Sequence, residues 1–132
     1  MKYLLDTHII LWALVDDKRI SPNLKKLLVD INNETLYSTV SSWEVALKHS
    51  KKESFSLTED QFIFLCENNG LINLPINNKH ILNLKNIIKA EDIDHKDPFD
   101  LMLLAQAISE NAILITHDKK FRAYGNSNIM IV

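Results

Sequence analysis

Four acidic residues stand just after short apolar runs or in the first turn of expected helices: Asp6, Glu44, Asp100 and Asp118. Carboxylates that converge at one edge of a sheet repel one another, so a divalent cation is their natural counter-ion. A ligand set made of oxygen atoms alone favours Mg²⁺ or Mn²⁺, because Zn²⁺ prefers His and Cys. Such an acidic site typically activates water and stabilises in-line displacement at a phosphate.

Taken one at a time, most of these acids also have an ordinary structural interpretation. Asp97, three residues before Asp100, suits the N-cap of a helix that starts at Pro98. Asp100 would then interact favourably with the dipole of that helix. Asp118 suits an Asx turn, and Glu44 suits a solvated helix surface. The residue types alone leave these alternatives open.

Asp6 is the exception, because it lies inside the mainly apolar stretch Tyr3–Trp12. A charge in such a stretch is expected to be buried near the sheet. Burying a carboxylate is costly unless it is paired or bound to a cation. Asp6 is therefore the strongest single indication of a cation site in this sequence.

The elements expected around these acids alternate between strand and helix. Short apolar strands are predicted at Lys2–Asp6, Leu36–Val40, Leu71–Leu74, Ala112–Thr116 and Ile129–Val132. Strands without polar alternation are typical of a parallel sheet that is buried under helices on both sides. Ligands of such α/β sheets bind at the carboxyl ends of the strands, which is where the strand-terminal acids are expected.

Start and stop signals predict the helices between these strands. N-cap residues place helix starts at Ser21-Pro22, at Ser41 or Ser42, at Thr58, at Asn77 and at Asp97-Pro98. The first helix is expected to run to about Ile31 and the last to about Glu110. Gly70 is expected to end the third helix in a positive-φ conformation.

The composition is that of one globular domain, expected to span residues 1–132, with 46% hydrophobic and 24% charged residues. Cys66 is the single cysteine, which excludes an intramolecular disulfide and fits a reducing cytoplasm. The apolar run Ile9–Val15 is too short to span a bilayer. Asp6 and His8 make the N-terminal segment a poor signal peptide. A cytoplasmic protein without a membrane segment is expected.

The net charge is −2, whereas proteins that bind nucleic acids are usually basic. Counting the four acids as neutralised by metal turns this charge into +2, so the overall balance does not exclude RNA. Two basic groups follow the acids and either flank a site for a phosphate backbone or form solvated faces. They are Lys48, Lys51 and Lys52, and Lys119, Lys120 and Arg122.

In order and spacing, four segments resemble the PIN-domain ribonucleases, in particular the VapC-type toxins of toxin–antitoxin pairs. The segments are Tyr3–Trp12, Val40–Lys48, His95–Ala107 and Leu114–Phe121, and the resemblance covers nearly the whole chain. It implies an α/β fold, namely a three-layer α/β/α sandwich on a mostly parallel sheet of about five strands. It also implies endonucleolytic hydrolysis of RNA to 5′-phosphate and 3′-hydroxyl ends.

The same resemblance implies roles for individual residues. Mg²⁺ or Mn²⁺ would be held by the four matching acids, Asp6, Glu44, Asp100 and Asp118, with Asp97 as a further aspartate of this subgroup. Small hydroxyl residues would orient the carboxylates or bind phosphate or water, and these are Thr7, Ser41 and Thr116.

Three positions depart from the family pattern, and none of them is one of the four acids. Leu101 stands where an Arg often follows the third acid, which puts a phosphate contact there in doubt. His117 stands where the family often has Arg or Ser. The segment Lys51–Ser56 lacks the Gly that usually follows the glutamate helix.

Two other function classes remain for comparison. Haloacid-dehalogenase-like phosphatases also place an aspartate after the first strand, but they need a second Asp at the position of His8. A catalytically inactive PIN-like module that binds RNA or a protein partner would be marked by the loss of an acid, and all four are present.

The resemblance further implies three partners, namely the RNA substrate, a cognate antitoxin protein and a second copy of the chain in a homodimer. The sequence offers one candidate for the dimer surface. Leu82, Leu84, Ile87 and Ile88 are more apolar than one core face needs, although plain core packing explains them as well.

Overall fold

The computed structural model describes residues 1–51, 56–88 and 97–132. Its sheet has the strand order β3-β2-β1-β4-β5, and every neighbouring pair is parallel. The strands are β1 (Lys2–Leu5), β2 (Glu34–Ser38), β3 (Ile72–Leu74), β4 (Ile113–Thr116) and β5 (Ile129–Ile131). The predicted five-stranded parallel sheet is therefore confirmed.

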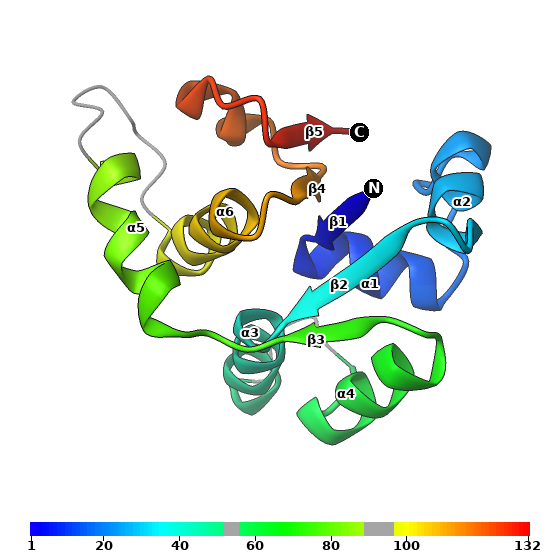
Figure 1. The fold of residues 1–132 in the computed structure, drawn as a ribbon. Helices are drawn as coiled ribbons and strands as arrows, with labels where there is room; N and C mark the ends of the chain where they lie inside the picture. The colour runs from blue at the N-terminus through cyan, green and yellow to red at the C-terminus, as the bar shows by residue number, and fades with distance from the viewer. Residues whose placement is uncertain (52–55, 89–96) are drawn as a thin grey trace.

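Helices cover both faces of this sheet (Figure 1). One face packs against α1 (Thr7–Leu14), α2 (Pro22–Val29) and α4 (Glu59–Asn68). The other packs against α5 (Asn78–Ile88), α6 (Pro98–Ser109) and the 3₁₀ helix η1 (Lys119–Tyr124). Helix α3 (Thr39–Ser50) contributes a buried valine to each side. The arrangement is the three-layer α/β/α sandwich that the resemblance implies.

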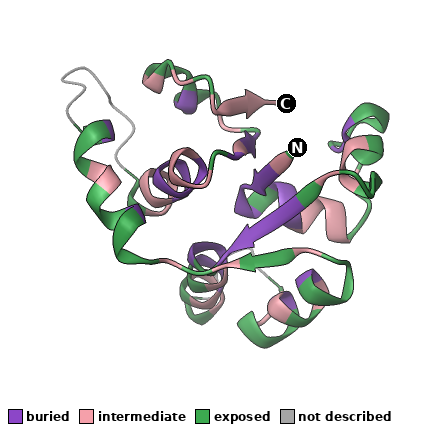
Figure 2. Cartoon of the chain, viewed as in Figure 1, coloured by how far each residue is buried: buried purple, intermediate pink, exposed green. Residues whose placement is uncertain are grey.

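Side-chain alternation along the strands explains why both faces are apolar. In β1, Tyr3 and Leu5 point into one core, and Leu4 points into the other. Figure 2 shows the resulting burial, which is concentrated in the central strands and on the helix sides that face them. Such strands carry continuous apolar runs instead of a polar face.

Several predicted boundaries are confirmed by capping contacts. Ser21 caps α2, and Thr58 forms a reciprocal capping box with Gln61 at the start of α4. Asn77 Oδ1 accepts a hydrogen bond from the backbone of His80 at 3.2 Å in the first turn of α5. Gly70 has the expected positive φ, at 81°.

The boundary between β2 and α3 was predicted wrongly. Ser38 caps α3, because its hydroxyl accepts a hydrogen bond from Val40 N at 2.9 Å. The strand predicted at 36–40 therefore ends two residues earlier, and Ser41 and Ser42 lie inside the helix instead of capping it. Two consecutive hydroxyl residues, Ser38 and Thr39, directly precede Val40, so a competent cap lies ahead of the two that were considered.

Two helices have no counterpart among the elements expected from the sequence. Helix α1 is apolar on all sides, with Ile9 and Ile10 buried and the next four residues half-buried, so it lacks a polar face to set a helical period. The 3₁₀ helix η1 follows from Asp118, whose side chain accepts a hydrogen bond from Lys120 N.

The exposed side of α5 is partly apolar. Leu84 and Ile87 pack into the core, so plain core packing accounts for half of the set considered as a dimer surface. Leu82 and Ile88 remain 65% and 60% exposed. No helix in the described part of the chain is long and apolar enough to cross a membrane.

A buried polar network ties α3 to the α5–α6 pair. Ser38 donates a hydrogen bond to Gln106 Oε1, and the amide nitrogen of Gln106 approaches His80 Nδ1 at 3.5 Å. His80 Nε2 lies 2.9 Å from Glu110 Oε2. Ser38, Gln106 and His80 are fully buried, so each polar atom depends on its partner within the protein.

Ser38 contacts Gln106 in this network and also caps α3, and the Ser38→Ala variant tests both contacts. We expect it to lower the free energy of unfolding by about 2 kcal/mol, because α3 loses its N-cap and Gln106 loses a buried donor. Chemical denaturation at pH 7 measures the change. Ser42→Ala is the matched control, since alanine suits a helix interior. Equal effects of the two substitutions would contradict the capping role.

Candidate functional site

The order of the strands creates a switch point between β1 and β4. The chain runs from β1 outward to β2 and β3, then returns to place β4 on the other side of β1. The loops that follow β1 and β4 therefore diverge and leave a crevice at the carboxyl edge, where open α/β sheets bind their ligands. Asp6 directly follows β1, and Asp118 follows β4 after one residue.

Asp6 is buried, with 7% of its surface exposed, and its carboxylate is held on both oxygens. Oδ1 accepts a hydrogen bond from Thr7 N at 2.7 Å, and Oδ2 accepts one from Thr116 Oγ1 at 2.6 Å. Thr116 Oγ1 also accepts from Asp118 N at 3.1 Å. One hydroxyl of β4 thus positions the acids that follow β1 and β4.

Thr7 and Ser41 lie one contact further from this carboxylate. Thr7 Oγ1 donates a hydrogen bond to Ser41 Oγ at 2.8 Å, and both side chains are fully buried. The contact joins the first turn of α1 to the first turn of α3. Of the three hydroxyl residues singled out in the sequence, only Thr116 touches a carboxylate of the four acids through its side-chain oxygen.

Glu44 lies in the second turn of α3, not in the first turn as predicted, because the helix begins at Thr39. It is 6% exposed. Its Oε2 pairs with Lys48 Nζ at 2.8 Å, one helical turn further on. A buried carboxylate in a water-excluded edge needs such a counter-charge.

The remaining two acids sit at the start of α6. Asp97 is exposed and caps the helix by accepting hydrogen bonds from Phe99 N at 2.8 Å and Asp100 N at 3.2 Å. Asp100 is half-buried in the first turn. The predicted cap-plus-proline start of this helix is confirmed.

All five acids line a single cavity of about 340 Å³. Four other side chains contribute to its wall, so that its lining among the described residues is Asp6, His8, Trp12, Glu44, Lys48, Asp97, Asp100, His117 and Asp118. Residues that lie far apart in the sequence thus come together at the carboxyl edge of the sheet. Trp12 was not considered as a site residue, although its spacing of four from His8 on α1 places the two on one helical face.

The crowding of carboxylates changes their protonation. Burial, and then the negative charges of Asp6, Asp97, Glu44 and Asp118, raise the pKa of Asp100 to about 8. Burial also raises the pKa of Asp6, in spite of the hydrogen bond from Thr116 that lowers it. Without a cation, the site therefore holds a proton that a divalent ion would displace.

The donor chemistry of this cavity fits a hard divalent cation, because its acidic ligands offer only oxygen. Within residues 1–51, 56–88 and 97–132, no three His, Cys, Asp or Glu side chains already stand in an arrangement that could hold a metal ion. Lys48 Nζ pairs with Glu44 Oε2 at 2.8 Å, so a cation that binds this oxygen competes with the ammonium group of Lys48.

The two basic groups of the sequence are only partly placed. Lys48 lines the cavity, and Lys119, Lys120 and Arg122 lie on η1, directly after Asp118. Lys52, His95 and most of the segment 51–56 lie outside the described residues.

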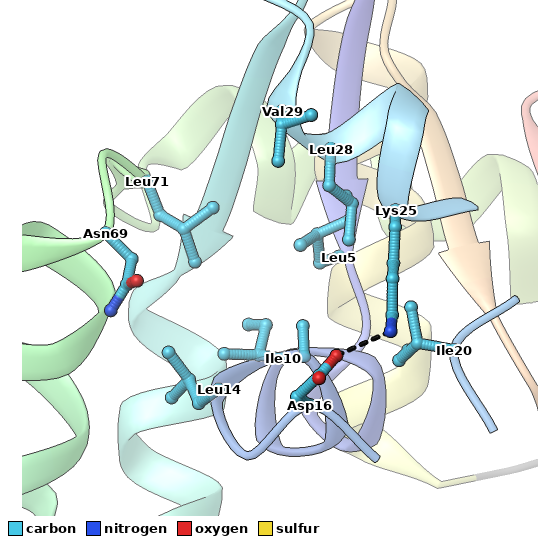
Figure 3. Close-up of a pocket in the computed structure, with 11 residues that line it drawn as sticks. Leu5, Ile10, Leu14, Asp16, Ile20, Lys25, Leu28, Val29, Asn69 and Leu71 are labelled. Carbon is cyan, nitrogen blue, oxygen red and sulfur yellow. Dashed lines mark ion pairs between the residues drawn. The ribbon is translucent and has the colours of Figure 1, made fainter. Parts of the chain in front are cut away.

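A second cavity, of about 270 Å³, lies between α1, α2 and the segment around Leu71 (Figure 3). Aliphatic side chains form most of its wall, and its charged groups, Lys25 Nζ and Asp16 Oδ1, pair with each other at 2.6 Å. It offers an apolar surface and lacks the carboxylate cluster of the first cavity.

Solved structures share this fold over essentially the whole chain. VapBC2 from Rickettsia felis bound to a promoter DNA fragment is 22% identical, with a TM-score of 0.72, and the match covers 100% of this chain and 98% of that one. VapBC-1 from nontypeable Haemophilus influenzae is 23% identical, with a TM-score of 0.72 and coverage of 99% and 98%. A toxin–antitoxin complex from Klebsiella pneumoniae is 21% identical, with a TM-score of 0.64 and coverage of 97% and 95%.

A comparison with curated protein sequences finds no match. The model of the PIN domain family matches residues 3–126, a range that begins within β1, extends beyond η1 and contains all five acids of the cavity. On this match, and with the fold that the solved structures share, the chain belongs to the PIN domain family.

Proposed function

We propose that this protein is a metal-dependent endoribonuclease that hydrolyses RNA phosphodiester bonds and acts as the toxin of a toxin–antitoxin pair. The observation that carries the proposal is the convergence of five carboxylates in one cavity at the switch point between β1 and β4. Membership of the PIN domain family supports a nuclease, and the likeness to VapBC structures supports a toxin.

In this proposal, Mg²⁺ or Mn²⁺ is held by Asp6, Glu44, Asp100 and Asp118, with Asp97 beside them. When bound, such an ion polarises the phosphodiester and makes water a nucleophile at neutral pH. The chain's own contribution is orientation: Thr116 and the backbone of Thr7 fix both oxygens of Asp6 before any ion arrives. Preorganised ligands of this kind lower the cost of binding.

Basic side chains around the cavity would bind the RNA backbone. With a cation at Glu44, the ammonium group of Lys48, which lines the same cavity, would contact a phosphate oxygen instead. Further positive charges lie on η1, directly after Asp118, and these are Lys119, Lys120 and Arg122. Contacts of this type give affinity for phosphates without reading a base sequence.

We further propose two protein partners, a cognate antitoxin and a second copy of the chain. The toxin–antitoxin complex from Klebsiella pneumoniae, which shares the fold, supports the first. Leu82 and Ile88, which leave large apolar side chains exposed on α5, support the second, because exposed apolar surface favours association.

Cleavage of total cellular RNA by the purified protein, with 5′ ends mapped by sequencing, tests the proposed activity. We expect discrete new ends with Mn²⁺, none with EDTA, and a loss of at least about 100-fold in Asp6→Asn, because the central ligand loses its charge. Asp60→Asn, an exposed acid on α4, is the matched control. Absence of metal-dependent ends, with Mn²⁺ bound in calorimetry, would favour an inactive binding module.

Lys48 competes with the cation for Glu44, and this competition is testable. We expect Lys48→Ala to bind Mn²⁺ about tenfold more tightly, since removing a positive charge from the cavity favours a second one. Isothermal titration calorimetry measures the affinity, with Lys26→Ala on α2 as the control. An unchanged or weaker affinity in Lys48→Ala would contradict this competition.

The raised pKa of Asp100 predicts how stability depends on pH when no metal is present. From about pH 4 to pH 8, the folded state keeps a proton on Asp100 that the unfolded state releases, so unfolding becomes easier as pH rises. We expect Asp100→Asn to gain in melting temperature over the wild type between pH 5 and pH 8 in EDTA. Thermal unfolding across this range measures it, and a constant difference would contradict the shift.

A further inference from the structure

A groove of about 500 Å³ opens beside the acidic cavity and shares two of its side chains, His8 and Trp12. Its floor is aliphatic, formed by leucines that include Leu57 and Leu65, and its rim is charged, formed by Asp17 and Arg19. The volume falls in the range of sites that accept small planar molecules. A ligand in this groove would be separated from the acids only by the side chains of the shared wall.

The rim of this groove carries a fixed planar cation. Arg19 Nε and Nη2 donate to the two carboxylate oxygens of Asp17 at 3.0 and 2.8 Å. This fork orients the guanidinium, and its central carbon lies 4.2 Å from the centre of the Trp12 ring. The result is a stack of two flat groups, one aromatic and one cationic, at a place where Arg19 is still 56% exposed.

Trp12 is also held from the side of the acidic cavity. The edge contact between the Trp12 and His117 rings has a centroid distance of 5.1 Å and an interplanar angle of 75°. His117 Nδ1 in turn lies 2.8 Å from the carbonyl oxygen of Val132. Trp12 is therefore held in place between the groove and the acids. This position suits it to orient a ligand that occupies both the groove and the acidic cavity.

From this geometry we infer that the groove binds an unpaired nucleobase of the RNA next to the phosphate that is cleaved. Aromatic faces and guanidinium planes are the groups on which splayed-out bases stack, and the aliphatic floor would receive the rest of the ring. The inference rests on the proposed function, since the acidic cavity locates the phosphate.

The two tryptophans of the chain allow a direct test of base stacking. In a Trp43→Phe background, Trp12 is the only tryptophan and reports on the groove. We expect a mixed-sequence five-nucleotide RNA to quench its fluorescence saturably in EDTA. The same strand with abasic nucleotides, and a blunt RNA duplex, are expected to leave the fluorescence unchanged. Equal quenching by the intact and the abasic strand would overturn the inference.

Cleavage kinetics in Mn²⁺ provide the second test. We expect Trp12→Leu to lose about five- to hundredfold in kcat/KM, mainly through KM, and Trp12→Phe to keep most of it, because stacking needs a ring. Arg19→Gln, at an exposed position, is expected to weaken binding in the same direction without disturbing the core. Mn²⁺ affinity should stay unchanged in all three variants.

These readouts separate the two proposals. If RNA is cut in a metal-dependent way but Trp12→Leu and Arg19→Gln cut as well as the wild type, the groove does not bind the base and the nuclease assignment stands. If RNA quenches Trp12 but is never cut, the groove stands and the nuclease assignment fails. A groove that responds to a protein partner and not to RNA would overturn the inference.

Discussion

Electrostatic repulsion among the carboxylates of the acidic cavity is the main physical constraint on this structure. Five acids line one small cavity, and two of them, Asp6 and Glu44, are almost fully buried. Groups of the protein itself offset this repulsion in two ways, with a proton that the raised pKa of Asp100 retains and with the Lys48 ammonium group on Glu44. Both are weaker partners than a divalent ion. Binding of a divalent ion would thus both stabilise the cavity and make it chemically active.

The backbone topology explains why acids so distant in the sequence meet. A parallel sheet directs every strand end to one edge, and the return of the chain from β3 to β4 opens a crevice between β1 and β4. Helices α3 and α6 then start from the same edge and bring Glu44 and Asp100 to it. Hydroxyl groups then orient the acids, most directly Thr116, which donates a hydrogen bond to the carboxylate of Asp6.

The sequence predicted the sheet, most helix starts and the grouping of the acids, because caps and apolar runs are local signals. It could not predict α1, since a helix with apolar residues around nearly its whole circumference shows no period. The cap of α3 was missed because several adjacent hydroxyl residues compete and only the tertiary contact of Ser38 with Gln106 decides between them. Trp12 as a cavity wall was missed because α1 itself was not predicted, and its spacing of four from His8 carries information only once that helix is known.

The buried network of Ser38, Gln106 and His80 has a consequence for ion selectivity. It joins the start of α3 to α6, the two helices that carry Glu44 and Asp100, through contacts in the interior of the protein. The span between these two carboxylates is therefore constrained by hydrogen bonds in the protein interior. Discrimination between ions of different radius would then depend on core residues that do not contact the ion, because these residues set the distance between its ligands.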